Sequence, residues 1–110
     1  MQLGELVRFA SLEALVPGDP EQEVAGAYVS DLLSDVMAHA HSGSVWITIQ
    51  THQNVIAVAS LLDLAAVILA GGHRAGPETI AKAESAGIPV YLSAEPSFIV
   101  AGRLYELGLR

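Results

Sequence analysis

Residues 45–74 constrain the fold more than any other part of the sequence, because they combine two strand-like segments with a helix-like segment between them. They read VWITIQTHQNVIAVASLLDLAAVILAGGHR. The first five are rich in β-branched residues, as is typical of a strand, and residues 53–62 have the alanine-rich composition of a helix. Residues 65–69 are apolar throughout, which predicts a strand covered on both faces. The segment therefore predicts a βαβ unit of a parallel sheet.

Turn and capping signals predict further helices on both sides of this unit. Ser30 is expected to be the N-cap of a helix, with Asp31 in its first turn. Pro77 and Gly87 are typical of the first position and the C-cap of a helix over residues 77–86. The buried stripe of the first helix is expected to consist of Leu32, Leu33, Val36 and Met37. In the last helix of the chain, the residues expected to point inward are Phe98, Ile99, Leu104 and Leu107.

The order of these elements predicts the fold class. From residue 30 onward helices and strands alternate, with a short strand expected at residues 90–92. This alternation predicts an α/β fold, namely a three-layer α/β/α domain with a mostly parallel sheet and helices on both faces. A length of 110 residues suits a single domain. Within it, residues 1–22 are expected to contribute an amino-terminal helix and strand.

Charge and cysteine content exclude several classes of partner. The formal net charge of −7 argues against nucleic acid and against an anionic membrane surface, both of which attract Lys and Arg. The chain has no cysteine, which excludes disulfides and thiol catalysis and suits the cytoplasm. No basic segment precedes an apolar run at the amino terminus, so no secretory signal is expected. The longest apolar run, residues 55–72, is interrupted by Ser60 and Asp63, so no membrane span is expected.

The high hydrophobic content of the chain favours association with a second copy or with a partner protein. Hydrophobic residues make up 52% of the chain and charged residues 15%. A small domain has much surface relative to its volume, so some apolar faces are expected to stay uncovered in a monomer. We therefore expect a homo-oligomer, a dimer or higher, or docking to a partner protein. The alternative is a monomer whose hydropathy is inflated by alanine.

Polar residues follow both strands of the central βαβ unit, at the edge where open α/β sheets bind ligands. The residues that we predict to bind a small anionic ligand at this edge are Thr51, His52, Gln53, Asn54, Gly71, Gly72, His73 and Arg74. The first four begin a helix, whose free N–H groups attract phosphate or carboxylate. The glycine pair offers backbone N–H groups, and Arg74 a counter-charge. The alternative is that these residues cap a helix and turn the chain without binding anything.

Neither catalytic motifs nor metal-ligand spacing is present. The sequence has no Gly-x-x-x-x-Gly-Lys-Ser/Thr phosphate loop and no Gly-x-Ser-x-Gly nucleophile elbow. Its four histidines are His39, His41, His52 and His73. None forms a His-x-x-x-His pair, and no carboxylate stands beside them at the spacing of a metal site. We therefore expect no enzyme, no metal and no cofactor.

Residues 23–110 resemble the DRTGG domain. The stretches that carry the resemblance are VAGAYVSDLLSDVMAHA, VWITIQTHQNVIAVASLLDLAAVILAGG, GIPVY and SFIVAGRLYELGL. That domain is similar to the amino-terminal domain of HPr kinase/phosphorylase, and both share a fold with the amino-terminal domains of Mur ligases. Thr51-His52 stands where the family has Asp-Arg, and Ala70-Gly71-Gly72 where it has Thr-Gly-Gly.

The resemblance implies a regulatory role. Members of the family occur fused to CBS domains, acyl-transfer enzymes and kinase domains, which implies a non-catalytic regulatory or ligand-sensing module. A small anionic metabolite or a nucleotide is the ligand expected at the carboxyl ends of the strands. The alternative is a protein-protein interaction or dimerisation module that binds no small molecule.

Overall fold

The computed structural model describes residues 1–110 and contains ten regular elements, and helices and strands alternate from residue 30 onward, as the sequence predicts. The helices are α1 (Leu3–Phe9), α2 (Leu33–His39), α3 (Asn54–Leu61), α4 (Pro77–Ala86) and α5 (Ser97–Glu106). The strands are β1 (Glu13–Val16), β2 (Gly26–Val29), β3 (Ser44–Thr48), β4 (Ala66–Leu69) and β5 (Val90–Leu92). The α/β fold class is confirmed.

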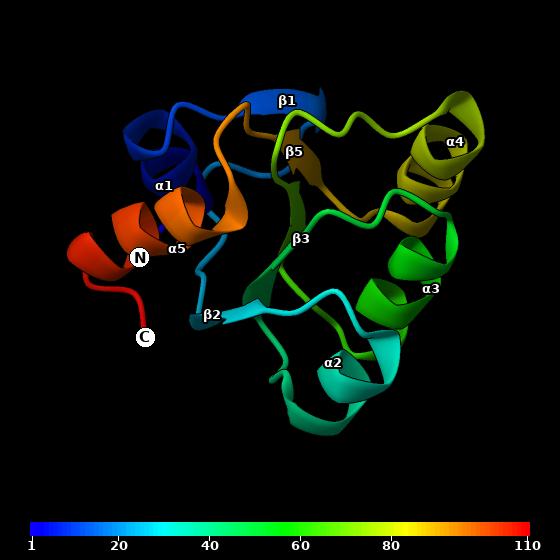
Figure 1. Cartoon of the computed structure of the whole chain (residues 1–110), viewed down its shortest axis with the longest axis horizontal. Helices are drawn as coiled ribbons and strands as arrows, with labels where there is room; N and C mark the ends of the chain where they lie inside the picture. The colour runs from blue at the N-terminus through cyan, green and yellow to red at the C-terminus, as the bar shows by residue number, and fades with distance from the viewer.

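The five strands form one sheet in the order β1-β5-β4-β3-β2. Strands β2 to β5 are parallel, and β1 runs antiparallel to β5 at one edge. Helices α2, α3 and α4 cover one face of the sheet and α1 and α5 the other, so the domain has three layers (Figure 1). From β2 to β5 each crossover leads to the neighbouring strand in the same direction, so the parallel strands contain no point where the winding reverses. Any cleft at their carboxyl ends must therefore be shaped by loops and helix ends.

Two apolar layers, one on each face of the sheet, form the core. Along β3 the side chains alternate: Trp46 belongs to the core layer under α2, α3 and α4, whereas Val45 and Ile47 belong to the layer under α1 and α5. Strand β4 lies in the middle of the sheet, and none of its residues is more than 2% exposed. This confirms that the apolar run at residues 65–69 is a central, doubly covered strand.

Helix α4 confirms the predictions made from its end signals. It begins with Pro77 at its first position and ends before Gly87, which adopts the left-handed conformation with φ 70°. Here only glycine adopts the required backbone without strain.

The predicted start of α2 is wrong. Of its predicted buried stripe, Val36 is buried and Leu33 packs against the core, whereas Leu32 and Met37 are exposed. The helix begins at Leu33, because Ser30 and Asp31 are used elsewhere: the Ser30 carbonyl accepts the Trp46 indole N–H, and Asp31 bonds to the end of β3. Leu32 therefore stays extended and 64% exposed. Met37 is 49% exposed, because it lies about 100° around the helix from the buried Val36.

Phe98 was also predicted to point inward, and it is 84% exposed instead. Val100 and Leu104, four residues apart, form the buried stripe of α5. Phe98 precedes Val100 by two positions, which places it about 200° around the helix and away from the sheet.

Candidate functional site

The loop after β3 is anchored to the loop after β2 by Asp31. Its Oδ1 accepts hydrogen bonds from Thr48 Oγ1 at 2.8 Å and from the Ile49 N–H at 2.9 Å. The side-chain amide of Gln50 donates to the Asp31 carbonyl at 3.3 Å. Sequence reasoning missed this role of Asp31, although an acidic residue directly after a strand was a usable signal. The anchor fixes the path of the chain just before the predicted site residues.

A cleft of about 430 Å³ opens between this loop and the first turn of α4. Its walls are residues 49–53 on one side and residues 76–79 on the other, and one of these nine residues is hydrophobic. The cleft lies at the carboxyl edge of the sheet, where the sequence predicted a ligand site.

Hydrogen bonds hold the two walls of the cleft in place. Thr79 Oγ1 donates to the Thr51 carbonyl at 2.8 Å and thereby joins α4 to the loop. At the start of α3, His52 Nδ1 accepts the Asn54 N–H at 3.0 Å. The cleft therefore has a defined shape, with the His52 ring orientation set by its contact with the backbone.

The first turn of α4 supplies hydrogen-bond donors to the cleft. Its N-cap is Gly76, and no side chain caps the helix. The backbone N–H groups of Glu78 and Thr79 have no hydrogen-bond partner within the protein. Such groups, at the positive end of a helix, bind phosphate and carboxylate oxygens. Glu78 also lines the cleft, and its negative charge opposes an anion there.

The structure separates the predicted site residues into two groups. Thr51, His52 and Gln53 line the cleft, whereas Asn54 begins α3 outside its lining. The loop of Gly71, Gly72, His73 and Arg74 is exposed and does not line the cleft, although β3 and β4 are neighbouring strands.

The backbone groups and the cation of the glycine loop are already engaged. The Gly71 N–H donates to the Glu95 carbonyl at 2.7 Å, and the Gly72 N–H donates to the Ser93 carbonyl at 2.9 Å. Both glycines have positive φ, which directs their N–H groups toward the segment between β5 and α5. Arg74 pairs with Glu13 on the antiparallel edge strand at 2.7 Å. In this arrangement the loop ties β4 to its neighbours.

A second hollow, a groove of about 270 Å³, lies on the opposite face of the sheet between α5 and strand β2. Seven of its eight lining residues are hydrophobic, and Arg110 is the exception. The lining residues are Ala27, Val29, Ile47, Ala101, Leu104, Tyr105, Leu109 and Arg110. The side chains of Val29 and Tyr105 are 47% and 62% exposed. Nothing in the fold covers this groove.

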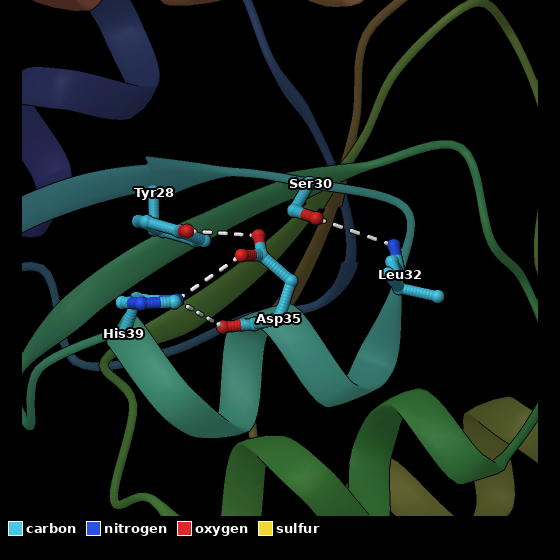
Figure 2. Close-up of polar contacts among 5 residues, drawn as sticks. All are labelled: Tyr28, Ser30, Leu32, Asp35 and His39. Carbon is cyan, nitrogen blue, oxygen red and sulfur yellow. Dashed lines mark hydrogen bonds and ion pairs between the residues drawn. The ribbon is translucent and has the colours of Figure 1, made fainter.

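On the other face of β2, a polar network joins the strand to α2. Figure 2 shows Tyr28 and His39 pointing toward the Asp35 carboxylate. Tyr28 Oη donates to Asp35 Oδ2 at 2.8 Å, and His39 Nδ1 lies 3.1 Å from Asp35 Oδ1. The bond from Tyr28 is the main reason that the pKa of Asp35 is lowered, with Ser30 and His39 adding to it. The same bond raises the pKa of Tyr28.

No group of three or more His, Asp or Glu side chains converges in the structure as a metal site would require. None of the five helices has both the length and the apolar character needed to cross a lipid bilayer.

Comparisons with known proteins identify the fold. No family model matches the sequence, and no curated protein matches it. Among solved structures, the protein is similar to the CBS and DRTGG domains of the regulatory region of Clostridium perfringens pyrophosphatase, complexed with the activator diadenosine tetraphosphate. The match has a TM-score of 0.71 and 19% sequence identity, and it covers 94% of this chain and 45% of that one. The likeness shows the fold, and it supports the DRTGG-like domain that the sequence predicted.

Proposed function

We propose that this protein is a non-catalytic regulatory domain that binds a small anionic ligand of the nucleotide class in the cleft beside α4. The observation that carries the proposal is the cleft itself: it is polar, lies at the carboxyl edge of a mostly parallel sheet and receives two unpaired N–H groups from α4. Sites of this kind bind anions through backbone donors and the helix dipole.

The structural neighbour supports a regulatory role. That protein is the regulatory region of a pyrophosphatase, and its structure contains the activator diadenosine tetraphosphate. This chain spans 45% of that structure's length, so the likeness extends to the fold of one part of it. The pyrophosphatase comparison therefore favours a sensing function and leaves the choice of ligand to experiment.

The proposed contacts follow from the lining of the cleft. The N–H groups of Glu78 and Thr79 would bind phosphate oxygens, and the side chains of Gln50, His52 and Gln53 would bind the polar groups of the rest of the ligand. Thr51 contributes its backbone to the wall. The residues Gly71, Gly72, His73 and Arg74 on the same edge, together with Asn54, remain predicted contacts for a ligand that extends beyond the cleft.

Titration with nucleotides tests the proposal. We expect adenosine phosphates or diadenosine tetraphosphate to raise the melting temperature, since a ligand at a hundred times its Kd stabilises by about 2.7 kcal/mol, which is several degrees for a domain of this size. His52→Ala and Gln53→Ala should weaken binding measured by calorimetry. His41→Ala, at an exposed histidine outside the cleft, is the matched control. Binding that is unchanged in both cleft variants, or the absence of binding by any nucleotide, would contradict the proposal.

A further inference from the structure

Strand β2 ends the sheet and is hydrogen-bonded on one side only, to β3. Its sequence, Gly-Ala-Tyr-Val, has no charged residue and no proline, and its register with β3 runs without a bulge. Charged residues, prolines and bulges are among the features by which edge strands normally avoid pairing with another chain, and β2 has none of them. The open edge of β2 is therefore suited to accept a further strand.

The backbone groups available for such pairing belong to Ala27 and Val29. The Ser30 N–H donates to the Ile47 carbonyl of β3. Because the direction of backbone groups alternates along a strand, those of Gly26 and Tyr28 also face β3. The N–H and C=O groups of Ala27 and Val29 therefore point out of the sheet edge, two donors and two acceptors in all.

We propose that a second copy of this chain pairs with β2 antiparallel, about a two-fold axis through Tyr28. In this register Ala27 of each copy lies opposite Val29 of the other. Two residues that face each other in this way exchange both of their backbone hydrogen bonds. All outward N–H and C=O groups of Ala27 and Val29 are then paired in both copies. With the axis at Ala27, Val29 would lie opposite Ala25, and with the axis at Val29, Ala27 would lie opposite Asp31. Neither Ala25 nor Asp31 belongs to β2.

The apolar groove described above is self-complementary in the same arrangement. Ala27 and Val29 point to the face covered by α5, and both line the groove. Val29 is 47% exposed in one copy, and in the pair it enters the groove of the other copy beside the small side chain of Ala27. A cavity of about 270 Å³ has room for this side chain. The second copy therefore removes apolar surface from water on both sides of the axis.

The match of β2 with itself favours a second copy as the occupant over an unrelated apolar segment. The outward backbone groups of Ala27 and Val29 pair completely with the same two residues of another copy, and the groove that receives Val29 is lined by Ala27 and Val29. A surface that is complementary to itself about a two-fold axis is the interface of a symmetric dimer.

Sedimentation of the whole chain tests the proposal. The wild type should sediment as a dimer, and Val29→Lys should weaken dimerisation at least about tenfold, because it places a charge in the groove of the other copy. The variant should keep its thermal transition, since Val29 is half exposed. Leu61→Lys is the matched control: Leu61 is 71% exposed on α3, away from β2, and its substitution should leave the dimer intact.

A single engineered cysteine tests the register, since the chain has none of its own. Residues 28 of the two copies face each other with Cα atoms about 4.5 Å apart, within the reach of a disulfide. Tyr28→Cys should therefore form a covalent dimer on oxidation, and Leu61→Cys should not. A wild type that sediments as a monomer at the highest concentration reached overturns the proposal. So does a dimer that is insensitive to Val29→Lys and not crosslinked through residue 28, because it would use another surface.

Discussion

Thr79 Oγ1 donates a hydrogen bond of 2.8 Å to the carbonyl oxygen of Thr51 and so joins the first turn of α4 to the loop after β3. Thr79 is buried, with 6% of its surface exposed. The Thr51 carbonyl has no other hydrogen-bond partner within the protein. This bond therefore links the two walls of the candidate cleft directly.

Thr79→Val tests this link. Valine keeps the shape of threonine but cannot donate, so the Thr51 carbonyl loses its partner. We expect a loss of about 1 kcal/mol of stability, which lowers the melting temperature by roughly 4–8 °C in a domain of this size. Thr79→Ser retains the hydroxyl and should keep most of the stability. Equal melting temperatures for the valine variant and the wild type would show that the bond does not hold the walls.

Arg74→Ala separates the cleft from the glycine loop as the place of binding. The pair of Arg74 and Glu13 is exposed on both sides, so its loss should change stability by less than about 1 kcal/mol in a thermal or denaturant transition. If the ligand stays within the cleft, calorimetry should give the same affinity for Arg74→Ala as for the wild type. A clear loss of affinity would show that the ligand extends to the glycine loop or binds there.

Glu78→Gln should strengthen the binding of any anion to the cleft. The Glu78 carboxylate lines the cleft and repels a phosphate bound at the start of α4, whereas glutamine removes the charge at nearly constant shape. Two charges at 4 Å in a water-exposed setting interact by about 1 kcal/mol, so the gain should be several-fold and should shrink as salt is added. Glu84→Gln, farther along α4, is the control. Weaker binding by Glu78→Gln would mean that the ligand uses Glu78 as an acceptor.

The parts of the fold that were predictable from the sequence are those set by local signals. Pro77 and Gly87 fix the ends of α4 through backbone preferences that hold in any context. The apolar run of β4 has no polar residue and can only be buried on both faces. Neither inference needs knowledge of what lies beside the element in space.

What the sequence did not reveal depends on contacts between distant residues. Ser30 has the side chain of a helix cap, but the Trp46 indole takes its carbonyl, and α2 starts three residues later. The glycine pair has free N–H groups in isolation, and the segment after β5 accepts both of them. The cleft forms between residues 49–53 and residues 76–79, which belong to two different crossovers. Of its lining, the sequence predicts only Thr51, His52 and Gln53 as site residues, and these lie on one wall.

Val67→Asp tests the central position of β4. Val67 is fully buried, with β3 on one side and β5 on the other. An aspartate there buries a charge with no partner, which costs more than a domain of this size has in stability. We expect no cooperative thermal transition. Ala57→Asp, on the exposed side of α3, should fold normally. A Val67→Asp variant with a transition near that of the wild type would contradict the observed strand order.

Tyr28→Phe should change the pH dependence of stability in two opposite ranges. Asp35, with its pKa lowered chiefly by Tyr28, stabilises the folded state above its ordinary pKa of 3.8, and this contribution is lost as the pH falls through the lowered value. Tyr28, with its pKa raised, stabilises below its ordinary pKa of 10.0, and this contribution is lost as the pH rises through the raised value. The melting temperature of the wild type should therefore exceed that of Tyr28→Phe most between these two ranges. The difference should shrink toward both extremes, in acid because Asp35 takes up a proton and in alkali because Tyr28 loses one.

Tyr105→Phe, at an exposed tyrosine outside the network, should follow the wild type at every pH. A constant difference between wild type and Tyr28→Phe across the whole range would show that the hydroxyl acts through packing and not through its bond to the carboxylate.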